Sequence, residues 1–171
     1  MLNRIISGGQ TGADRAGLDA AMASGFPAGG YCPEGRRAED GVIAERYQLE
    51  EIKGGYRQRT RRNVAESDAT LIVYSGMPEG GTALTIEFCL KLKKPFKLID
   101  MELVSDHEAA RALGAFLHDQ GVSCLNVAGP RESGCPGVHA YVFRVVSRVL
   151  ESLSDPAKSE WLAENCNQAG P

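Results

Sequence analysis

The chain has 171 residues, of which 43% are hydrophobic and 24% are charged, and its formal net charge is −3 at pH 7. This balance is typical of a globular domain and argues against a disordered chain and against a general nucleic-acid-binding protein. Because no apolar run is long enough to span a membrane and the first residues lack a signal peptide's apolar stretch, we expect a cytoplasmic protein with no membrane partner.

Short apolar runs alternate with helical patterns along the chain. We predict strands at residues 2–7, 26–32, 48–53, 69–75, 96–99 and 123–128, and helices at 13–24, 57–67, 82–92, 106–120 and 136–152. This alternation predicts an α/β protein with a Rossmann-like three-layer α/β/α fold and a mostly parallel sheet. We expect residues 1–152 to form a single ligand-binding domain and residues 153–171 to form a helical or disordered tail.

The first predicted strand and helix are joined by a glycine-rich segment, Ser7-Gly8-Gly9-Gln10-Thr11-Gly12-Ala13-Asp14-Arg15. Glycines permit positive φ and let backbone N–H groups approach a ligand oxygen, and a helix N-terminus attracts anions. The alternative is a tight turn with a T-x-x-D capping box, in which Asp14 serves its own helix. Three glycines within five positions favour ligand binding.

Two further glycine-rich segments also join a predicted strand to a helix. In Ser75–Thr85, Gly80 and Gly81 can expose backbone donors, and Thr82 can cap the helix or bond a phosphate. In Asn126–Gly137, Gly129 follows the strand, and Arg131 can either pair with an anion or remain a solvated surface charge.

All strand-to-helix loops of a parallel sheet leave the same edge, so the three glycine-rich segments are expected to face one cleft. Such a cleft suits an extended, multiply anionic ligand such as a nucleotide or a phosphorylated cofactor.

Two polar segments are candidates for the border of this cleft. In the loop at residues 32–41, Arg36 can bind a phosphate, and Glu39 and Asp40 can bind ribose hydroxyls or a divalent ion. A solvated loop with self-compensating charge explains them equally well. In the predicted helix at residues 57–67, Arg59, Thr60 and Asn63 share one face and can reach the ligand together.

The five cysteines form no C-x-x-C pair, and the chain has only three histidines. This pattern predicts neither a disulfide framework nor a structural metal site. Cys32 and Cys135 lie in loops rich in glycine and proline, so they are the two cysteines to test for contact with a bound metal.

Together these motifs resemble those of the molybdenum carrier family, a circularly permuted, YpsA-related branch of a Rossmann-like group. That group also holds cytokinin-activating phosphoribohydrolases and the DNA-processing protein DprA. The matching motifs are Gly8-Gly9-Gln10-Thr11-Gly12-Ala13-Asp14-Arg15, Cys32-Pro33-Glu34-Gly35-Arg36, Ala38-Glu39-Asp40-Gly41, Arg59-Thr60, Asn63-Val64, Ser67-Asp68, Gly80-Gly81-Thr82 and Asn126-Val127-Ala128-Gly129-Pro130-Arg131. The resemblance implies a protein that binds a nucleotide-like ligand, with molybdenum cofactor, a phosphorylated pterin, as the candidate. It also implies a homo-oligomer, most simply a dimer.

One acidic residue is a candidate for catalysis. The phosphoribohydrolases carry P-G-G-x-G-T-x-x-E, and Glu87 follows Gly80-Gly81 at the matching distance. The motif departs elsewhere, because Glu79 replaces the proline, Ala83 a glycine and Leu84 the threonine. These departures favour a solvated helix position for Glu87 over a catalytic one.

The leading hypothesis is therefore a binding or carrier protein for a phosphorylated, nucleotide-like ligand, which is either molybdenum cofactor or a nucleotide. The alternatives are a hydrolase of nucleoside monophosphates that uses Glu87, and a sensor module whose assembly responds to the ligand. The candidate ligand-binding residues are Gly8, Gly9, Gln10, Thr11, Gly12, Asp14, Arg15, Arg36, Glu39, Asp40, Arg59, Thr60, Asn63, Gly80, Gly81, Thr82, Gly129 and Arg131.

Overall fold

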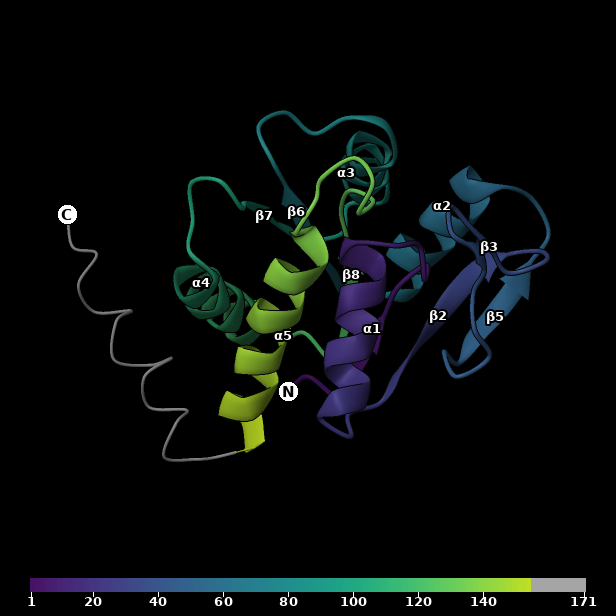
Figure 1. The fold of residues 1–171 in the computed structure, drawn as a ribbon. Coiled ribbons are helices and arrows are strands. Elements are labelled where there is room, and N and C mark those ends of the chain that lie inside the picture. The colour runs from purple at the N-terminus through teal and green to yellow at the C-terminus, as the bar shows by residue number, and fades with distance from the viewer. Residues whose placement is uncertain (155–171) are drawn as a thin grey trace.

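The computed structural model describes residues 1–154 (Figure 1), so the predicted tail lies almost entirely outside the described residues. The strands are β1 (Arg4–Ile6), β2 (Ala28–Pro33), β3 (Arg37–Ala38), β4 (Gly41–Val42), β5 (Leu49–Ile52), β6 (Ala69–Tyr74), β7 (Phe96–Asp100) and β8 (Cys124–Ala128). The helices are α1 (Ala13–Ala23), α2 (Tyr56–Glu66), α3 (Gly80–Leu92), α4 (Asp106–Asp119) and α5 (Val138–Ser154).

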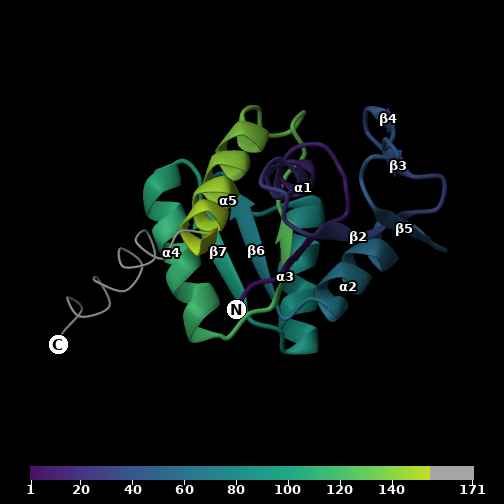
Figure 2. The ribbon, with the colours of Figure 1, turned by 90° about the horizontal axis from the view of Figure 1, so that it is seen from below.

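Six of the strands form one parallel sheet in the order β5-β2-β1-β8-β6-β7. The connection β1-α1-β2 and the connection β6-α3-β7 run in opposite directions across this sheet, so right-handed crossovers place α1 and α3 on opposite faces. Figure 2 shows the result, with α1, α4 and α5 over one face and α2 and α3 over the other. The predicted Rossmann-like α/β fold is confirmed.

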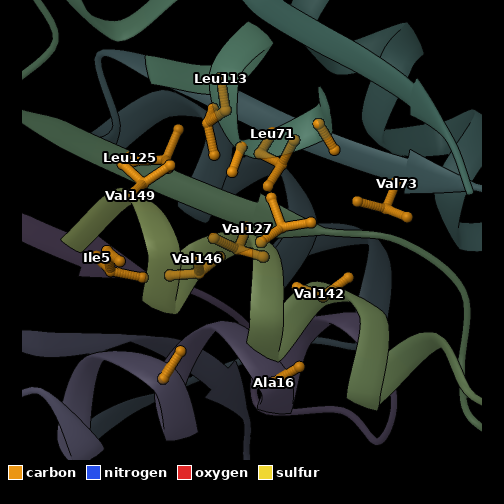
Figure 3. Packing of buried hydrophobic residues seen from close by; sticks show 14 of the residues in the cluster. Ile5, Ala16, Leu71, Val73, Leu113, Leu125, Val127, Val142, Val146 and Val149 are labelled. Atoms are coloured by element: carbon orange, nitrogen blue, oxygen red, sulfur yellow. The ribbon is translucent and has the colours of Figure 1, made fainter. Parts of the chain in front are cut away.

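The larger hydrophobic core lies between the sheet and α1, α4 and α5 (Figure 3). On β8, Leu125 and Val127 enter this core, and because strand side chains alternate between faces, Asn126 points to the face that α2 and α3 cover. A second cluster, which includes Val64, Ile72, Phe88 and Cys89, packs on that face. Asn126 is therefore a polar side chain in the interior of the protein, between the apolar residues Leu125 and Val127 of the same strand.

The helix α1 approaches the sheet closely because its buried side chains are small. A Cβ atom added at Gly17 would lie 2.7 Å from the Cβ of Val127, so only glycine fits at this point. Ala13, Gly17 and Ala20 of this helix are buried, whereas Ser24 is the exposed C-cap residue.

Two local predictions need correction. Pro136 is not the first residue of the last helix, because Gly137 has a φ of +88° and α5 begins at Val138. The polar loop at residues 32–41 contains the antiparallel hairpin β3–β4. Within residues 1–154, no helix combines the length and hydrophobicity needed to cross a membrane.

Candidate functional site

A cavity of about 670 Å³ opens at the carboxyl ends of β1, β6 and β8. It is bounded by the segments that start α1, α2, α3 and α5, so the three glycine-rich segments do lie around one space. The predicted site residues that line it are Gln10, Asp14, Arg59, Thr60, Asn63, Gly80, Gly81, Thr82, Gly129 and Arg131. The others lie outside its wall, namely Gly8, Gly9, Thr11, Gly12, Arg15, Arg36, Glu39, Asp40 and Glu87.

The glycines between β1 and α1 are required by packing against the rest of the chain. A Cβ atom at Gly8 would overlap the Arg59 guanidinium, at 1.6 Å from Nη1. At Gly9, where φ is +71°, it would lie 2.5 Å from Leu49. At Gly12, where φ is +77°, it would lie 2.4 Å from the carbonyl oxygen of Pro130. These close approaches explain the three glycines without a ligand.

Most backbone amides of this first segment are also engaged within the protein. The Asp14 carboxylate accepts hydrogen bonds from the backbone N–H groups of Gly8 and Gln10. The Thr11 amide donates to Gln10 Oε1 at 3.0 Å, and the amide of Ala13 donates to the Pro130 carbonyl at 3.2 Å. The N-cap of α1 is Gly12, which makes no side-chain cap, so the T-x-x-D capping box does not form.

A buried ion pair connects α1 and α2 beside the cavity. Arg59 Nη1 donates to Asp14 Oδ2 at 2.6 Å, and both side chains are almost fully buried. Burial raises the pKa of the Asp14 carboxyl, and the Arg59 guanidinium opposes this rise. Arg59 Nε has no hydrogen-bond partner among the described residues. Arg59 therefore lines the cavity with Nη1 bound to Asp14 and with Nε unpaired within residues 1–154.

The segment between β6 and α3 differs from the first because its glycines are open. Cβ atoms at Gly80 and Gly81 would meet nothing within 4 Å. The amides of Thr82 and Ala83 bond back to the Glu79 carbonyl at 3.0 and 3.2 Å, but no described residue accepts a hydrogen bond from the Gly80 or Gly81 amide. Both glycines line the cavity and begin a helix of 13 residues, and unpaired N–H groups at a helix start favour an anion.

The segment between β8 and α5 supplies Arg131 and Cys135 to the cavity wall. The Arg131 guanidinium lies 5.4 Å from the ring centre of Tyr56 and 3.9 Å from Glu39 Oε2. Cys135 Sγ lies 3.5 Å from Met101 Sδ, and burial raises the pKa of its thiol. By contrast, Cys32 is completely buried against Ile43 and outside this wall.

Among residues 1–154, no three His, Cys, Asp or Glu side chains come together in a group that could hold a metal ion.

The turn of the β3–β4 hairpin, Glu39 and Asp40, is engaged by the protein. The Glu39 carboxylate bonds the hydroxyls of Thr11 and Ser133, and Asp40 pairs with Arg15. These contacts lower the pKa of both carboxyls below their ordinary values. The backbone N–H of Glu39 also donates to Gln10 Oε1 at 2.9 Å. The turn therefore connects the first and third glycine-rich segments.

Several other polar candidates have structural partners. The Arg36 guanidinium donates to four backbone carbonyls between the end of β4 and the start of β5, those of Ile43, Ala44, Tyr47 and Leu49. Asn63 bonds both the N–H and the carbonyl of Tyr31, each at 3.0 Å, and the Thr60 hydroxyl donates to the Tyr56 carbonyl. The donors of Arg36 are therefore used in shaping the fold.

Glu87 lies on an exposed part of α3, outside the cavity. Its carboxylate pairs with Lys91 and, at 3.5 Å, with Arg57. Lys91 first, and then Arg57, lower the pKa of Glu87. The geometry therefore gives it the solvated helix position that the departures from the phosphoribohydrolase motif favour.

Several residues of the wall were not among the candidate ligand-binding residues, namely Tyr56, Tyr74 and, although it stands in a matching motif, Asn126. For Asn126 a signal exists, because it is a carboxamide inside the apolar run Leu125-Asn126-Val127. A polar residue in a strand buried on both faces needs a partner or a ligand. Tyr56 and Tyr74 carry no such signal, because a tyrosine is ordinary at the start of a helix, where Tyr56 stands, and at the end of a strand, where Tyr74 stands.

Comparisons with known proteins agree with this architecture. Residues 5–150 match the circularly permutated YpsA SLOG family. A crystal structure from Syntrophus aciditrophicus, described as a "putative molybdenum carrier protein", is 42% identical in sequence and superposes with a TM-score of 0.83. That match covers 85% of this chain and 94% of the other. No curated protein matches the chain. From the matched span and this identity we conclude that the chain belongs to the circularly permutated YpsA SLOG family.

Proposed function

We propose that this protein binds a phosphorylated, nucleotide-like small molecule in the cavity and acts as a binding or carrier protein. The observation that carries the proposal is the open first turn of α3. There the Gly80 and Gly81 amides lack acceptors among the described residues and line a cavity that Arg59 and Arg131 also line. Unpaired N–H groups at a helix start and nearby guanidinium groups stabilise an oxyanion.

The size and polarity of the cavity support a ligand larger than an inorganic anion. A volume of about 670 Å³ lies within the range of sites for small organic ligands. Gln10 supports a polar ligand, because Gln10 Nε2 is buried and has no partner among the described residues. Such an orphaned donor is costly unless another group accepts its hydrogen bond.

Molybdenum cofactor is the specific ligand that the related protein suggests. The Syntrophus aciditrophicus protein is described as a "putative molybdenum carrier protein", and this chain is 42% identical to it in sequence. In our proposal the cofactor is cargo, and its phosphate lies at the first turn of α3. Neutral N–H donors suit reversible binding of such a group because they do not titrate.

We propose binding without hydrolysis of the ligand. The carboxylates in the cavity wall are Asp14, which is paired with Arg59, and Glu79. Glu87 lies outside the wall and pairs with Lys91 and Arg57, which does not support its use as an acid or base on a ligand in the cavity. Incubation with nucleoside monophosphates should release no free base above the level of a Glu87→Gln variant. Release by the wild type that this variant loses would contradict binding alone.

The proposal is tested by ligand-dependent thermal stability. A panel of nucleoside mono- and diphosphates and molybdopterin should contain ligands that raise the melting temperature of the wild type. At a hundred times its Kd, a ligand stabilises the native state by about 2.7 kcal/mol. Gly81→Leu should abolish the shift, because its side chain enters the open space at the first turn of α3.

Gly55→Leu is the matched control. Gly55 is the N-cap of α2, has a φ of −100° and lies outside the cavity wall, and a Cβ there would have 3.8 Å to its nearest neighbour, Gln58 Oε1. This variant should keep the full ligand shift. An unchanged melting curve of the wild type across the panel, or an equal shift in Gly81→Leu, would contradict the proposal.

A further inference from the structure

Asn126 is a buried carboxamide at the base of the cavity. Its side chain is 3% exposed, and it lies on the central strand β8. Its neighbours Leu125 and Val127 point into the core on the opposite face of the sheet. A carboxamide in this position loses its water contacts, which is costly unless its polar atoms find partners.

The protein itself provides only part of these partners. Asn126 Nδ2 donates to Thr70 Oγ1 at 3.3 Å, and the Thr70 hydroxyl in turn bonds the Cys89 thiol. Within the described residues, no group donates a hydrogen bond to Asn126 Oδ1, and this side chain lines the cavity. The contact with Thr70 holds the amide end, which leaves the carbonyl oxygen as an acceptor for a ligand.

The cavity wall thus offers two kinds of hydrogen-bonding group. The first turn of α3 and the arginines offer donors to an anion, whereas Asn126 offers an acceptor. Tyr74, Leu84 and Pro78 also line the wall. A wall that combines such side chains with a buried carboxamide acceptor is suited to a flat ring that carries N–H groups on its edge.

We propose that Asn126 is a specificity-determining residue that recognises the N–H edge of a planar heterocycle attached to the bound phosphate. Guanine and pterin are two sources of this chemistry, since both carry a ring N–H beside an amino group. Thr70 is the positioning residue that orients the carboxamide. This inference rests on the proposed binding function and specifies the planar ring, the part of the ligand that the phosphate site does not contact.

The test compares ligands with and without the ring by isothermal titration calorimetry. The probes are guanosine 5′-monophosphate, 6-hydroxymethylpterin pyrophosphate and two controls that lack the planar heterocycle, ribose 5-phosphate and inorganic pyrophosphate; these two are called the ringless controls. Asn126→Leu has a similar volume but no hydrogen-bonding group. It should weaken at least one ring-bearing probe by about tenfold or more relative to its effect on the ringless controls. Whichever ring-bearing probe binds the wild type more tightly identifies the source of the ring.

Thr70→Val tests the positioning role, with a selective loss in the same direction but smaller. Asn126→Ser is the alternative if the leucine variant does not fold, as judged by its melting curve. If no probe binds the wild type, the binding function itself fails. If ring-bearing probes bind the wild type but lose no more affinity than the ringless controls in the Asn126 variants, the role of Asn126 is refuted while binding stands.

Discussion

The ion pair between Asp14 and Arg59 connects the fold to the cavity at the scale of single residues. The guanidinium lies over Gly8, which has no Cβ, and reaches a carboxylate that also accepts two backbone N–H groups. Because Arg59 already forms an ion pair with Asp14, we propose that the ligand's phosphate binds mainly to the α3 amides and to Arg131. Removing one partner of such a pair leaves an uncompensated buried charge, which is more costly than never having had the pair.

Arg59→Met should therefore lower the free energy of unfolding by about 3–5 kcal/mol. The double variant Asp14→Asn with Arg59→Met should recover part of this loss, because it removes the stranded carboxylate. Chemical denaturation at neutral pH measures both. Arg62→Met is the control on the same helix, since Arg62 forms an exposed pair with Glu66, and it should change stability little. Equal effects of Arg59→Met and Arg62→Met would contradict a buried structural pair.

At the scale of elements, helix glycines differ according to what lies beside them. Gly17 of α1 faces Val127 of β8 with no room for a methyl group, whereas Gly81 of α3 faces open space. Helix propensity alone favours alanine over glycine by about 1 kcal/mol at an interior position. Packing opposes this preference at Gly17 and does not oppose it at Gly81.

Gly17→Ala should therefore destabilise the protein, by about 1–3 kcal/mol, because the added methyl group forces α1 away from the sheet. Gly81→Ala should be neutral or slightly stabilising in the absence of ligand. Thermal and urea unfolding of the two variants give the comparison. A stabilising Gly17→Ala would show that α1 can move without cost and would contradict the packing that we describe.

The elements themselves were largely predictable, because local patterns determine them. The run Leu71-Ile72-Val73-Tyr74 predicts β6 from its apolar side chains alone, and β–α alternation predicts the parallel sheet. The tertiary contacts that require the glycines between β1 and α1 and that engage Arg36 were not predictable. Gly12 is needed because Pro130 approaches it from more than a hundred residues away, and Arg36 binds carbonyls whose positions depend on how the following segment folds. Contacts of this kind cannot be inferred from the local sequence.

At the scale of the whole molecule, the turn of the β3–β4 hairpin joins segments far apart in the chain. Glu39 bonds Thr11 after β1 and Ser133 after β8, while Asp40 pairs with Arg15 of α1. The backbone amide of Glu39 also donates to Gln10 Oε1, and Gln10 lines the cavity. The candidate site was thus partly predictable, since the segments do converge, but the hairpin's partners come from the tertiary structure.

This connection should depend on pH in a defined direction. Because hydrogen bonds lower the pKa of folded Glu39 below its ordinary value of 4.5, its stabilising contribution is present at higher pH and is lost as the pH falls below 4.5. The difference in unfolding free energy between wild type and Glu39→Gln should stay constant between neutral pH and about pH 5 and shrink at lower pH. Urea unfolding across this series measures it.

Glu45→Gln is the control for this series, because Glu45 is an exposed carboxylate on the same stretch of chain. Its difference from the wild type should show much less change with acidification. A Glu39→Gln difference that does not vary with pH would mean that the hairpin turn is not held by the ionised carboxylate.

The two ends of the parallel strands form two different rims of the molecule, one at the carboxyl ends and one at the amino ends. The segments around the cavity all leave the carboxyl ends of the strands, whereas the turns at Gly25 and Gly121 precede β2 and β8 at the other rim, with open space around both. A surface tether or a fluorophore attached at that far rim would leave the entrance of the cavity clear. The rim at Gly25 and Gly121 is therefore the side at which the protein can be attached to a surface and used as a sensor for a ligand of the cavity.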